Sequence, residues 1–234
     1  MIKPLTRCAA LLLALLPPAA LAGRPLQTED AGVLDRGACE VEGFHAHASA
    51  GGASALENSL QLGCGIGLDS QVALAASTAR AGGDRERGLA LGGKTGLWKA
   101  AGDDAPALTL AWGLAWARAD GAPRRHAATE LRLVYSAPAF AGTVWHANLG
   151  HARDEIARQR STTWALALEH EGFDLGVNLA PMAEIVGDDR QAPLWNLGLR
   201  ATLQPERVFV DASYGRQIAS GRPRLWTLGF KIAF

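Results

Sequence analysis

The feature that most constrains this chain is an alternation of large apolar residues with small or polar ones, which recurs from residue 39 to the C-terminus. In the segment LTLAWGLAW, Leu108, Leu110, Trp112 and Leu114 fall on one side, and Thr, Ala and Gly occupy the other. A period of two residues is typical of β-strands whose two faces meet different surroundings, whereas a helix would repeat after about 3.6 residues. The chain is therefore predicted to be all-β.

The second side of these strands indicates the class of β protein, because it contains Gly, Ala, Asn and charged residues. Each alternating segment has about ten residues, as a tilted membrane-spanning strand needs, whereas a soluble sandwich would have shorter strands with Val and Ile on the apolar face. Hydrophobic residues make up 48% of the chain, but a mean hydropathy of +0.03 excludes a bundle of membrane helices. The expected fold is a transmembrane up-and-down antiparallel β-barrel over residues 39–234, in the outer membrane of a Gram-negative-type bacterium.

Twelve alternating segments can be delimited, an even number as bacterial barrels need. They are residues 39–48, 56–66, 71–79, 89–98, 107–118, 127–136, 140–151, 161–170, 173–183, 194–203, 207–216 and 224–234. Most connections at one end are brief, and those at the other are longer and charged, such as RAGGDRER and ARDEIARQR. Because such barrels have short periplasmic turns and longer outer loops, both chain ends are predicted to lie in the periplasm. A ten-stranded barrel is the alternative, since the first segment is irregular.

Aromatic and basic residues are distributed as this layout requires. Aromatic residues fall near the outer boundary at Trp116, Trp164, Trp195, Tyr214 and Trp226, and near the inner one at Trp98, Tyr135, Phe140, Phe173 and Phe234. Two such girdles are typical of membrane barrels. Basic residues gather in the outer connections, including Arg85, Arg87, Arg124, Arg125, Arg158, Arg160 and Arg222. They are expected either to contact lipopolysaccharide phosphates or to remain solvated beside neighbouring Asp and Glu.

The first 22 residues are predicted to be a signal peptide. Lys3 and Arg7 precede an apolar stretch, and Ala20-Leu21-Ala22 fits the cleavage rule, so the mature chain would begin at Gly23. An uncleaved anchor is disfavoured, because two prolines shorten the stretch below spanning length. Residues 23–38 have no clear period and are predicted either to hang in the periplasm or to fold into the lumen as a plug.

Cys39 and Cys64 are predicted to form a disulfide, which export permits. If Phe44 opposes Leu60 on the next strand, a bulge at Gly43 brings Cys39 opposite Cys64. Directly opposed residues have Cα atoms about 4.5–5.5 Å apart, within disulfide range. Both cysteines would then point outward near the periplasmic rim.

Polar residues on the inner side of the strands are the main candidate site. The alternation directs into the lumen Lys94, Glu130, Arg132, His146, Asn148, Glu169, Asn178, Asn196, Arg200, Asp211 and Lys231. A charge facing lipid at mid-depth would cost several kcal/mol, so these groups must face inward. Two interpretations stay open: a salt-bridge network that fills a narrow interior, or the polar lining of a solute path.

Other kinds of site have weaker support. An outer-membrane hydrolase would need a Ser–His arrangement, and His146, Asn148, His151, His170 and Ser213 form no recognisable motif, so no enzyme activity is expected. His45 and His47 share a face, but two ligands without a third favour a polar wall over a metal site. Gly65-Ile66-Gly67 is followed by no helix and is predicted to relieve crowding inside the barrel. The net charge of +0 gives no reason to expect nucleic-acid binding, and no cofactor is indicated.

Several blocks resemble one family of outer-membrane proteins. They are RPLQTEDAGVLDRGACEVE, WHANLGH, ERVFVDASYGRQ and LWTLGFKIAF. They are similar to the barrel family of MetA-pathway phenol-degradation proteins, which implies a passive outer-membrane transporter or channel for small hydrophobic or aromatic solutes, without catalytic residues. The resemblance of RPLQTEDA favours the plug. Phe234 resembles the terminal signature that the barrel-assembly machinery binds. The alternatives are a structural or interaction barrel with a closed lumen and an outer-membrane lipid hydrolase.

Overall fold

The computed structural model describes residues 26–102, 105–140, 142–218 and 223–234, so the predicted signal peptide lies outside it. Within these ranges, twelve long antiparallel strands and one two-residue strand form a single sheet. The bounds are β1 Cys39–Ala50, β2 Ala53–Gly67, β3 Ser70–Ala81, β4 Asp84–Lys99, β5 Ala107–Ala119, β6 Arg125–Phe140, β7 Thr143–Asp154, β8 Gln159–His170, β9 Phe173–Asp174, β10 Asn178–Asp188, β11 Leu194–Gln204, β12 Val208–Gln217 and β13 Arg224–Ala233.

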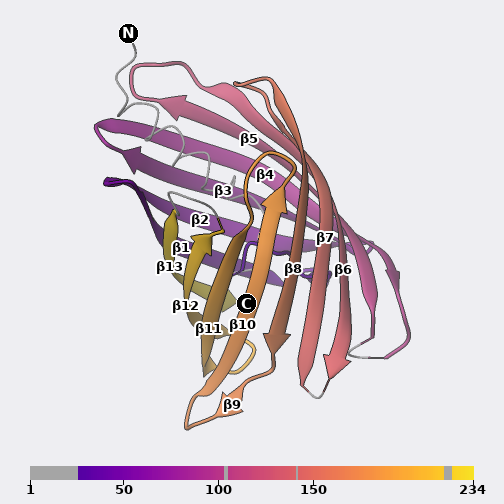
Figure 1. The fold of residues 1–234 in the computed structure, drawn as a ribbon. Coiled ribbons are helices and arrows are strands. Elements are labelled where there is room, and N and C mark those ends of the chain that lie inside the picture. The colour runs from indigo at the N-terminus through magenta and orange to yellow at the C-terminus, as the bar shows by residue number, and fades with distance from the viewer. Residues whose placement is uncertain (1–25, 103–104, 141, 219–222) are drawn as a thin grey trace.

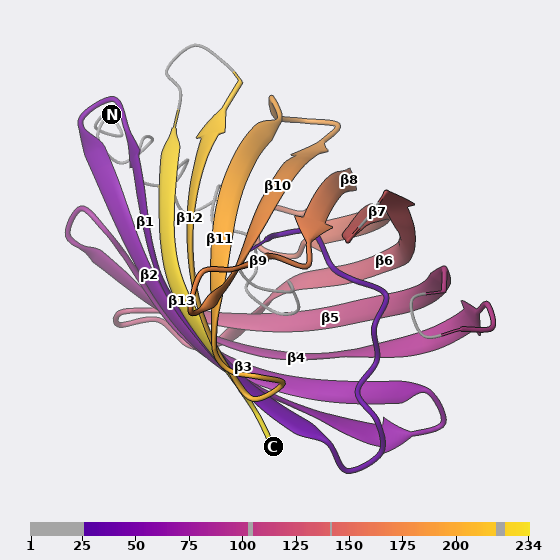
Figure 2. The ribbon, with the colours of Figure 1, turned by 90° about the horizontal axis from the view of Figure 1, so that it is seen from below.

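The sheet closes on itself, because β1 pairs with β13 and every other long strand pairs with its two neighbours along the chain (Figures 1 and 2). Closure leaves no unpaired sheet edge, which is the condition for crossing lipid with strands. The predicted twelve-stranded barrel is confirmed. No helix among the described residues is long and apolar enough to span a membrane.

The expected strand over residues 173–183 is wrong in its position. Phe173 and Asp174 form β9, which folds back on the start of β10, and the long strand runs from Asn178 to Asp188. Gly172 and Gly176 adopt positive φ angles of 101° and 89° around this small hairpin, a backbone conformation that glycine tolerates best. The shift brings Glu184, predicted to lie in a loop, into the wall of the barrel.

The predicted difference in loop length between the two ends is also wrong. Many of the charged residues assigned to outer loops continue the strands, as Arg85 and Arg87 do in β4. The connection between β3 and β4 is only residues 82–83, whereas β4 and β5 are joined at the opposite end by residues 100–106. Extension of the ladder satisfies backbone hydrogen bonds that an open loop would leave to water.

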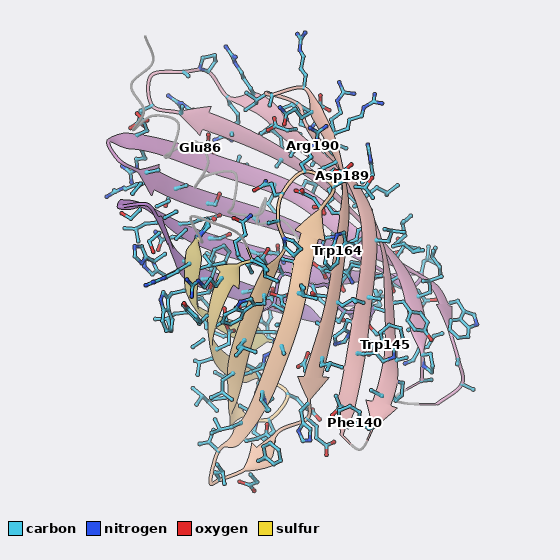
Figure 3. The ribbon with its side chains drawn as sticks, viewed as in Figure 1. Glu86, Phe140, Trp145, Trp164, Asp189 and Arg190 are labelled. Carbon is cyan, nitrogen blue, oxygen red and sulfur yellow. A yellow bond between two sulfur atoms is a disulfide. The ribbon has the colours of Figure 1, made fainter. Side chains whose placement is uncertain are left out.

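The outer face of the barrel presents a continuous apolar belt. Leu60, Leu74, Leu149 and Leu228 are between 54% and 62% exposed, far more apolar surface than a soluble protein leaves open. Aromatic rings meet at the belt's edges: the ring centroids of Tyr214 and Trp226 are 4.4 Å apart, and those of Trp195 and Tyr214 are 5.6 Å apart. In Figure 3, Phe140 and Trp145 lie toward one end of the barrel, and Asp189 and Arg190 lie toward the other.

Cys39 on β1 and Cys64 on β2 are joined by a disulfide, with Cα atoms 4.1 Å apart. The register that opposes them is regular and has no bulge at Gly43, which corrects the expected pairing: Gly43 opposes Leu60, and Phe44 opposes Ser59. Gly43 faces outward beneath the ring of Phe230, where a Cβ would collide with it. Phe44 therefore points into the barrel and packs against an inner apolar cluster.

The disulfide gives a direct test of this register. In mature protein isolated without reductant and unfolded, we expect no free thiol, and two thiols after reduction. Mass spectrometry after alkylation measures both states. Two alkylated cysteines in the unreduced sample would show that β1 and β2 are not linked.

Candidate functional site

Residues 26–38, here called the inner segment, run along the inside of the barrel wall before β1 begins. Figure 2 shows this segment crossing the inner face of several strands. Its hydrogen-bond partners come from successive strands around the barrel: Glu184 of β10, Asn148 of β7, Ser136 of β6, Thr109 of β5, Lys94 of β4 and Gln71 of β3. Residues 26–38 therefore lie inside the barrel, whereas residues 23–25 of the predicted plug or periplasmic segment lie outside the described residues.

Glu184 binds the beginning of the inner segment. Its carboxylate accepts hydrogen bonds from the amides of Gln27 and Thr28 at 2.8–2.9 Å and from the Thr28 hydroxyl at 2.7 Å. The Asn196 side chain donates a further bond to it at 2.9 Å. A buried carboxylate with this many donors satisfies most of its acceptor sites, so it fixes the segment backbone in direction as well as position.

Two apolar contacts add to these polar bonds. Leu26 is 3% exposed, and it packs on the inner faces of β8 and β10 against Ala167, Ala180 and Met182. Ala31 packs on β5 and β6 against Ala111 and Val134. Small residues on these strands leave room for the segment, as Gly65 also does: a Cβ there would collide with the backbone oxygens of Leu34 and Asp35.

A buried ion pair lies at the centre of the inner segment. Lys94 Nζ is 3.1 Å from Glu29 Oε2, and the two side chains are 7% and 1% exposed. The same ammonium donates to the Asp30 carbonyl at 3.1 Å. Asn148 holds the Glu29 backbone on both sides, because it accepts from the amide at 2.8 Å and donates to the carbonyl at 2.9 Å. A charge pair this deep is stable only while both partners are present.

Ser136, His146 and Glu169 form a chain that resembles the order of a hydrolase triad. Ser136 Oγ is 2.7 Å from His146 Nδ1, and His146 Nε2 is 3.8 Å from Glu169 Oε2. However, Ser136 Oγ accepts a 2.8 Å hydrogen bond from the Ala31 amide. A nucleophilic serine needs an open approach for a substrate carbonyl. This serine instead anchors the inner segment.

A polar cavity of about 60 Å³ lies inside the barrel beside the inner segment. It is bordered by Leu26, Thr28, Glu29, Asp30, Glu40, Glu42, Gln61, Gln71, Lys94, His146, Glu169, Arg200 and Lys231. Lys231 forms an ion pair with Glu40 and lies 3.7 Å from Glu42 Oε1, and Arg200 Nη1 is 3.1 Å from Glu169 Oε1. A cavity of this size holds a few water molecules and no larger solute without movement.

The structure places the predicted inward residues on the inner face, and most of them meet partners there. Arg132 pairs with Glu130 on its own strand, and Arg200 pairs with Glu169. Asn178 differs, because its amide donates to the Glu171 carbonyl in the connection between β8 and β10.

Sequence reasoning missed several residues that matter as much: Glu29, Glu40, Glu42, Ser136 and Glu184. The same alternation directs Glu40, Glu42 and Ser136 inward, because Cys39 is predicted to point outward and Tyr135 belongs to an aromatic girdle that faces lipid.

The histidines at the start of the barrel do not line the lumen. The expected polar wall at His45 and His47 is wrong, because Ala46 and Ala48 point inward and both histidines face outward. His45 Nδ1 lies 2.9 Å from Asn58 Oδ1 on the outer surface of β2. In the part of the chain that the structure describes, no three His, Cys, Asp or Glu side chains are arranged to hold a metal ion.

Comparisons with known proteins give a family and a fold. Residues 10–234 match the family model of the uncharacterised conserved protein UCP029691, and the expected phenol-degradation family is not confirmed. No curated protein is significantly similar in sequence.

Among solved structures, the KdgM porin in complex with disordered oligogalacturonate matches with a TM-score of 0.60 and 8% identity, covering 83% of this chain and 99% of the porin. The COG4313 outer membrane channel from Pseudomonas putida F1 matches with a TM-score of 0.59 and 11% identity, covering 88% and 98%. The NanC porin matches with a TM-score of 0.55 and 10% identity, covering 82% and 98%. At these identities the likeness concerns the fold. Together with the exposed apolar belt, it identifies an outer-membrane β-barrel.

Proposed function

We propose that this chain, which belongs to the family of the uncharacterised conserved protein UCP029691, is a passive channel for small solutes that its own inner segment keeps narrow. The observation that supports this most directly is the polar cavity beside the segment. A barrel with a purely structural role could fill its centre with packed side chains, as small barrels do. Here polar and charged groups from eight different strands border water-sized space instead.

The solute class follows from two surfaces inside the barrel. Toward the end opposite Cys39, an apolar wall is formed by Phe44, Val186, Leu194 and Leu225 around small alanines. Near the chain ends, the cavity is charged. A small hydrophobic or aromatic solute that also has one polar group would be complementary to both surfaces. We therefore propose that the solutes are hydrophobic or aromatic, as expected from the sequence, and that each also has one polar group.

The charge of the cavity favours one sign of solute. Five acidic residues border it, Glu29, Asp30, Glu40, Glu42 and Glu169, against three basic ones, Lys94, Arg200 and Lys231. A narrow pathway with excess negative charge attracts cations and repels anions. An acidic oligosaccharide such as the one named with the KdgM porin would be disfavoured here.

Flux into proteoliposomes tests the proposal. Tyramine and 4-hydroxybenzoate share a phenol ring and differ in charge, so we expect tyramine to enter faster than 4-hydroxybenzoate, and both to exceed protein-free vesicles. Replacing Leu194 and Leu225 by Asn should slow tyramine, whereas Thr227→Ser, on the same inner face, should not. Rates equal to protein-free vesicles for both solutes would support the closed structural barrel instead.

We also propose that the barrel has no lipid-hydrolase activity. The Ser136 oxygen is occupied by the inner segment and faces the lumen, away from the lipid belt. A hydrolase of the outer membrane must present its nucleophile where lipid can reach it. Release of fatty acid from phospholipid by the purified protein, abolished by Ser136→Ala, would contradict this assignment.

A further inference from the structure

Four arginines form an unusual patch on the outer face of β3, β4 and β5. Arg80 directly opposes Arg85, and Arg87 directly opposes Arg118. All four continue the outward-facing side of their strands, which lower down consists of residues such as Leu74, Leu91 and Leu114. The position of Glu86, between Arg85 and Arg87, is marked in Figure 3; by the same alternation its side chain points inward.

The patch begins where the apolar belt ends. In the ladder, Leu89 opposes Trp116, and this is the last large apolar pair on the outward side of β4 and β5. The next outward pair along these strands is Arg87 with Arg118. Trp116 lies toward the end of the barrel opposite Cys39 and Phe234, and with both chain ends in the periplasm, as expected, this end is the outer one. The guanidinium groups therefore lie at the height at which lipid headgroups replace acyl chains.

Among the described residues, no carboxylate compensates this patch. None of the four arginines forms an ion pair with a described residue, although Asp120 follows nearby in the turn after β5. Arg85 Nε is buried and has no hydrogen-bond partner among the described residues. Like charges directly opposed across a ladder are destabilising, so an isolated patch of this kind is costly.

A second pair of opposed arginines in this protein has a carboxylate partner. Arg153 opposes Arg160 on β7 and β8, and Arg153 Nε lies 3.0 Å from Glu155 Oε2. The patch on β3 to β5 has no such partner in the described protein, which points to an anion from outside the chain.

We propose that Arg80, Arg85, Arg87 and Arg118 bind the phosphate groups of an outer-leaflet lipid of the lipopolysaccharide type. Guanidinium groups bind phosphate oxygens through paired hydrogen bonds, and each phosphate can bridge two opposed arginines. The position at the edge of the belt selects a lipid phosphate over one in solution, because the lipid's acyl chains would cover the apolar residues directly below. The proposal is independent of the proposed channel.

Binding of the refolded, lipid-free protein to lipopolysaccharide micelles tests it. Replacing all four arginines by Gln should weaken binding by at least about tenfold, as the loss of several charge-assisted bonds requires. The matched control, Arg124→Gln with Arg158→Gln, removes two loop arginines at the same end of the barrel and should bind as the unaltered protein does. Heat-modifiable migration in gels verifies that each variant is folded. If the fourfold variant does not fold, the double variant Arg87→Lys with Arg118→Lys, which keeps the charge, replaces it in the binding test.

Two further arms separate the sources of phosphate. Dephosphorylated lipopolysaccharide should bind the unaltered protein as weakly as the intact lipid binds the fourfold variant. Inorganic phosphate at millimolar concentration should not displace the intact lipid. Equal binding of intact and dephosphorylated lipid, equal binding by the fourfold variant, or full displacement by inorganic phosphate would each overturn the proposal.

Discussion

Deleting residues 23–38 is expected to convert a barrel of low conductance into one with a large, steady conductance in planar bilayers. The inner segment runs through the lumen from β10 to β2, beside a polar cavity of about 60 Å³. A twelve-stranded barrel is wider than one whose interior side chains alone can fill, so removal of the segment should raise conductance by roughly an order of magnitude.

Single-channel recordings of the refolded mature protein and of the deletion variant measure this effect. Asp35→Asn is the matched control, because Asp35 lies in the same segment with an exposed side chain and should leave the conductance unchanged. A large conductance from the intact protein would show that the segment does not obstruct the lumen. An unchanged low conductance after deletion would show that the wall residues alone close it.

Replacing Lys94 by Met is expected to release the inner segment without removing it. The Glu29 carboxylate would stay in an environment where it is 1% exposed, with no cation in contact. Removing one partner of a buried pair costs about 3–5 kcal/mol. That is at least about a hundredfold in the fraction of docked segment.

Hydrogen exchange at the amides of Gln27, Thr28, Glu29 and Ala31 measures docking directly, because each is bonded to a barrel side chain. We expect slow exchange in the unaltered protein and fast exchange in the Lys94→Met variant, with conductance rising in parallel. Adding Glu29→Met should restore most of the protection, since paired apolar replacement of a buried ion pair is close to neutral. Lys99→Met, an exposed change on the same strand, should have no effect. Protection that survives Lys94→Met would mean that the ion pair does not hold the segment.

The alternation of the sequence predicts the barrel because successive residues of a strand face lipid and lumen in turn, and lipid requires apolar side chains whereas the lumen accepts polar ones. The same rule places Lys94, Asn148 and Arg200 inside before any contact is known. It does not predict where a strand ends: Glu184 lies among charged and turn-forming residues, and its pairing with Ala167 and Asn196 across the ladder keeps it in β10.

The path of the inner segment could not be predicted from the sequence. Its bonds join residues far apart in the chain, such as Gln27 with Glu184, and no local period accompanies them. The orientation of Phe44 has a similar origin, because it depends on the room that Gly43 leaves for Phe230 on the last strand. These details depend on packing between residues that lie far apart in the chain, so they cannot be predicted from local composition.

The inner segment is covalently continuous with Cys39, and Cys39 is bonded both to Cys64 by its sulfur and to Phe234 through its backbone. A released segment therefore cannot diffuse away, and it can rebind its site as a tethered ligand. The effective concentration of a peptide on so short a tether is on the order of millimolar, whatever the dilution of the protein. Closure of the lumen is thus a first-order event in a single molecule, so the fraction of closed barrels should not change with their number in the membrane. A free peptide with the sequence of residues 23–38 would have to reach that concentration to close a barrel without the segment as completely as the tethered segment does.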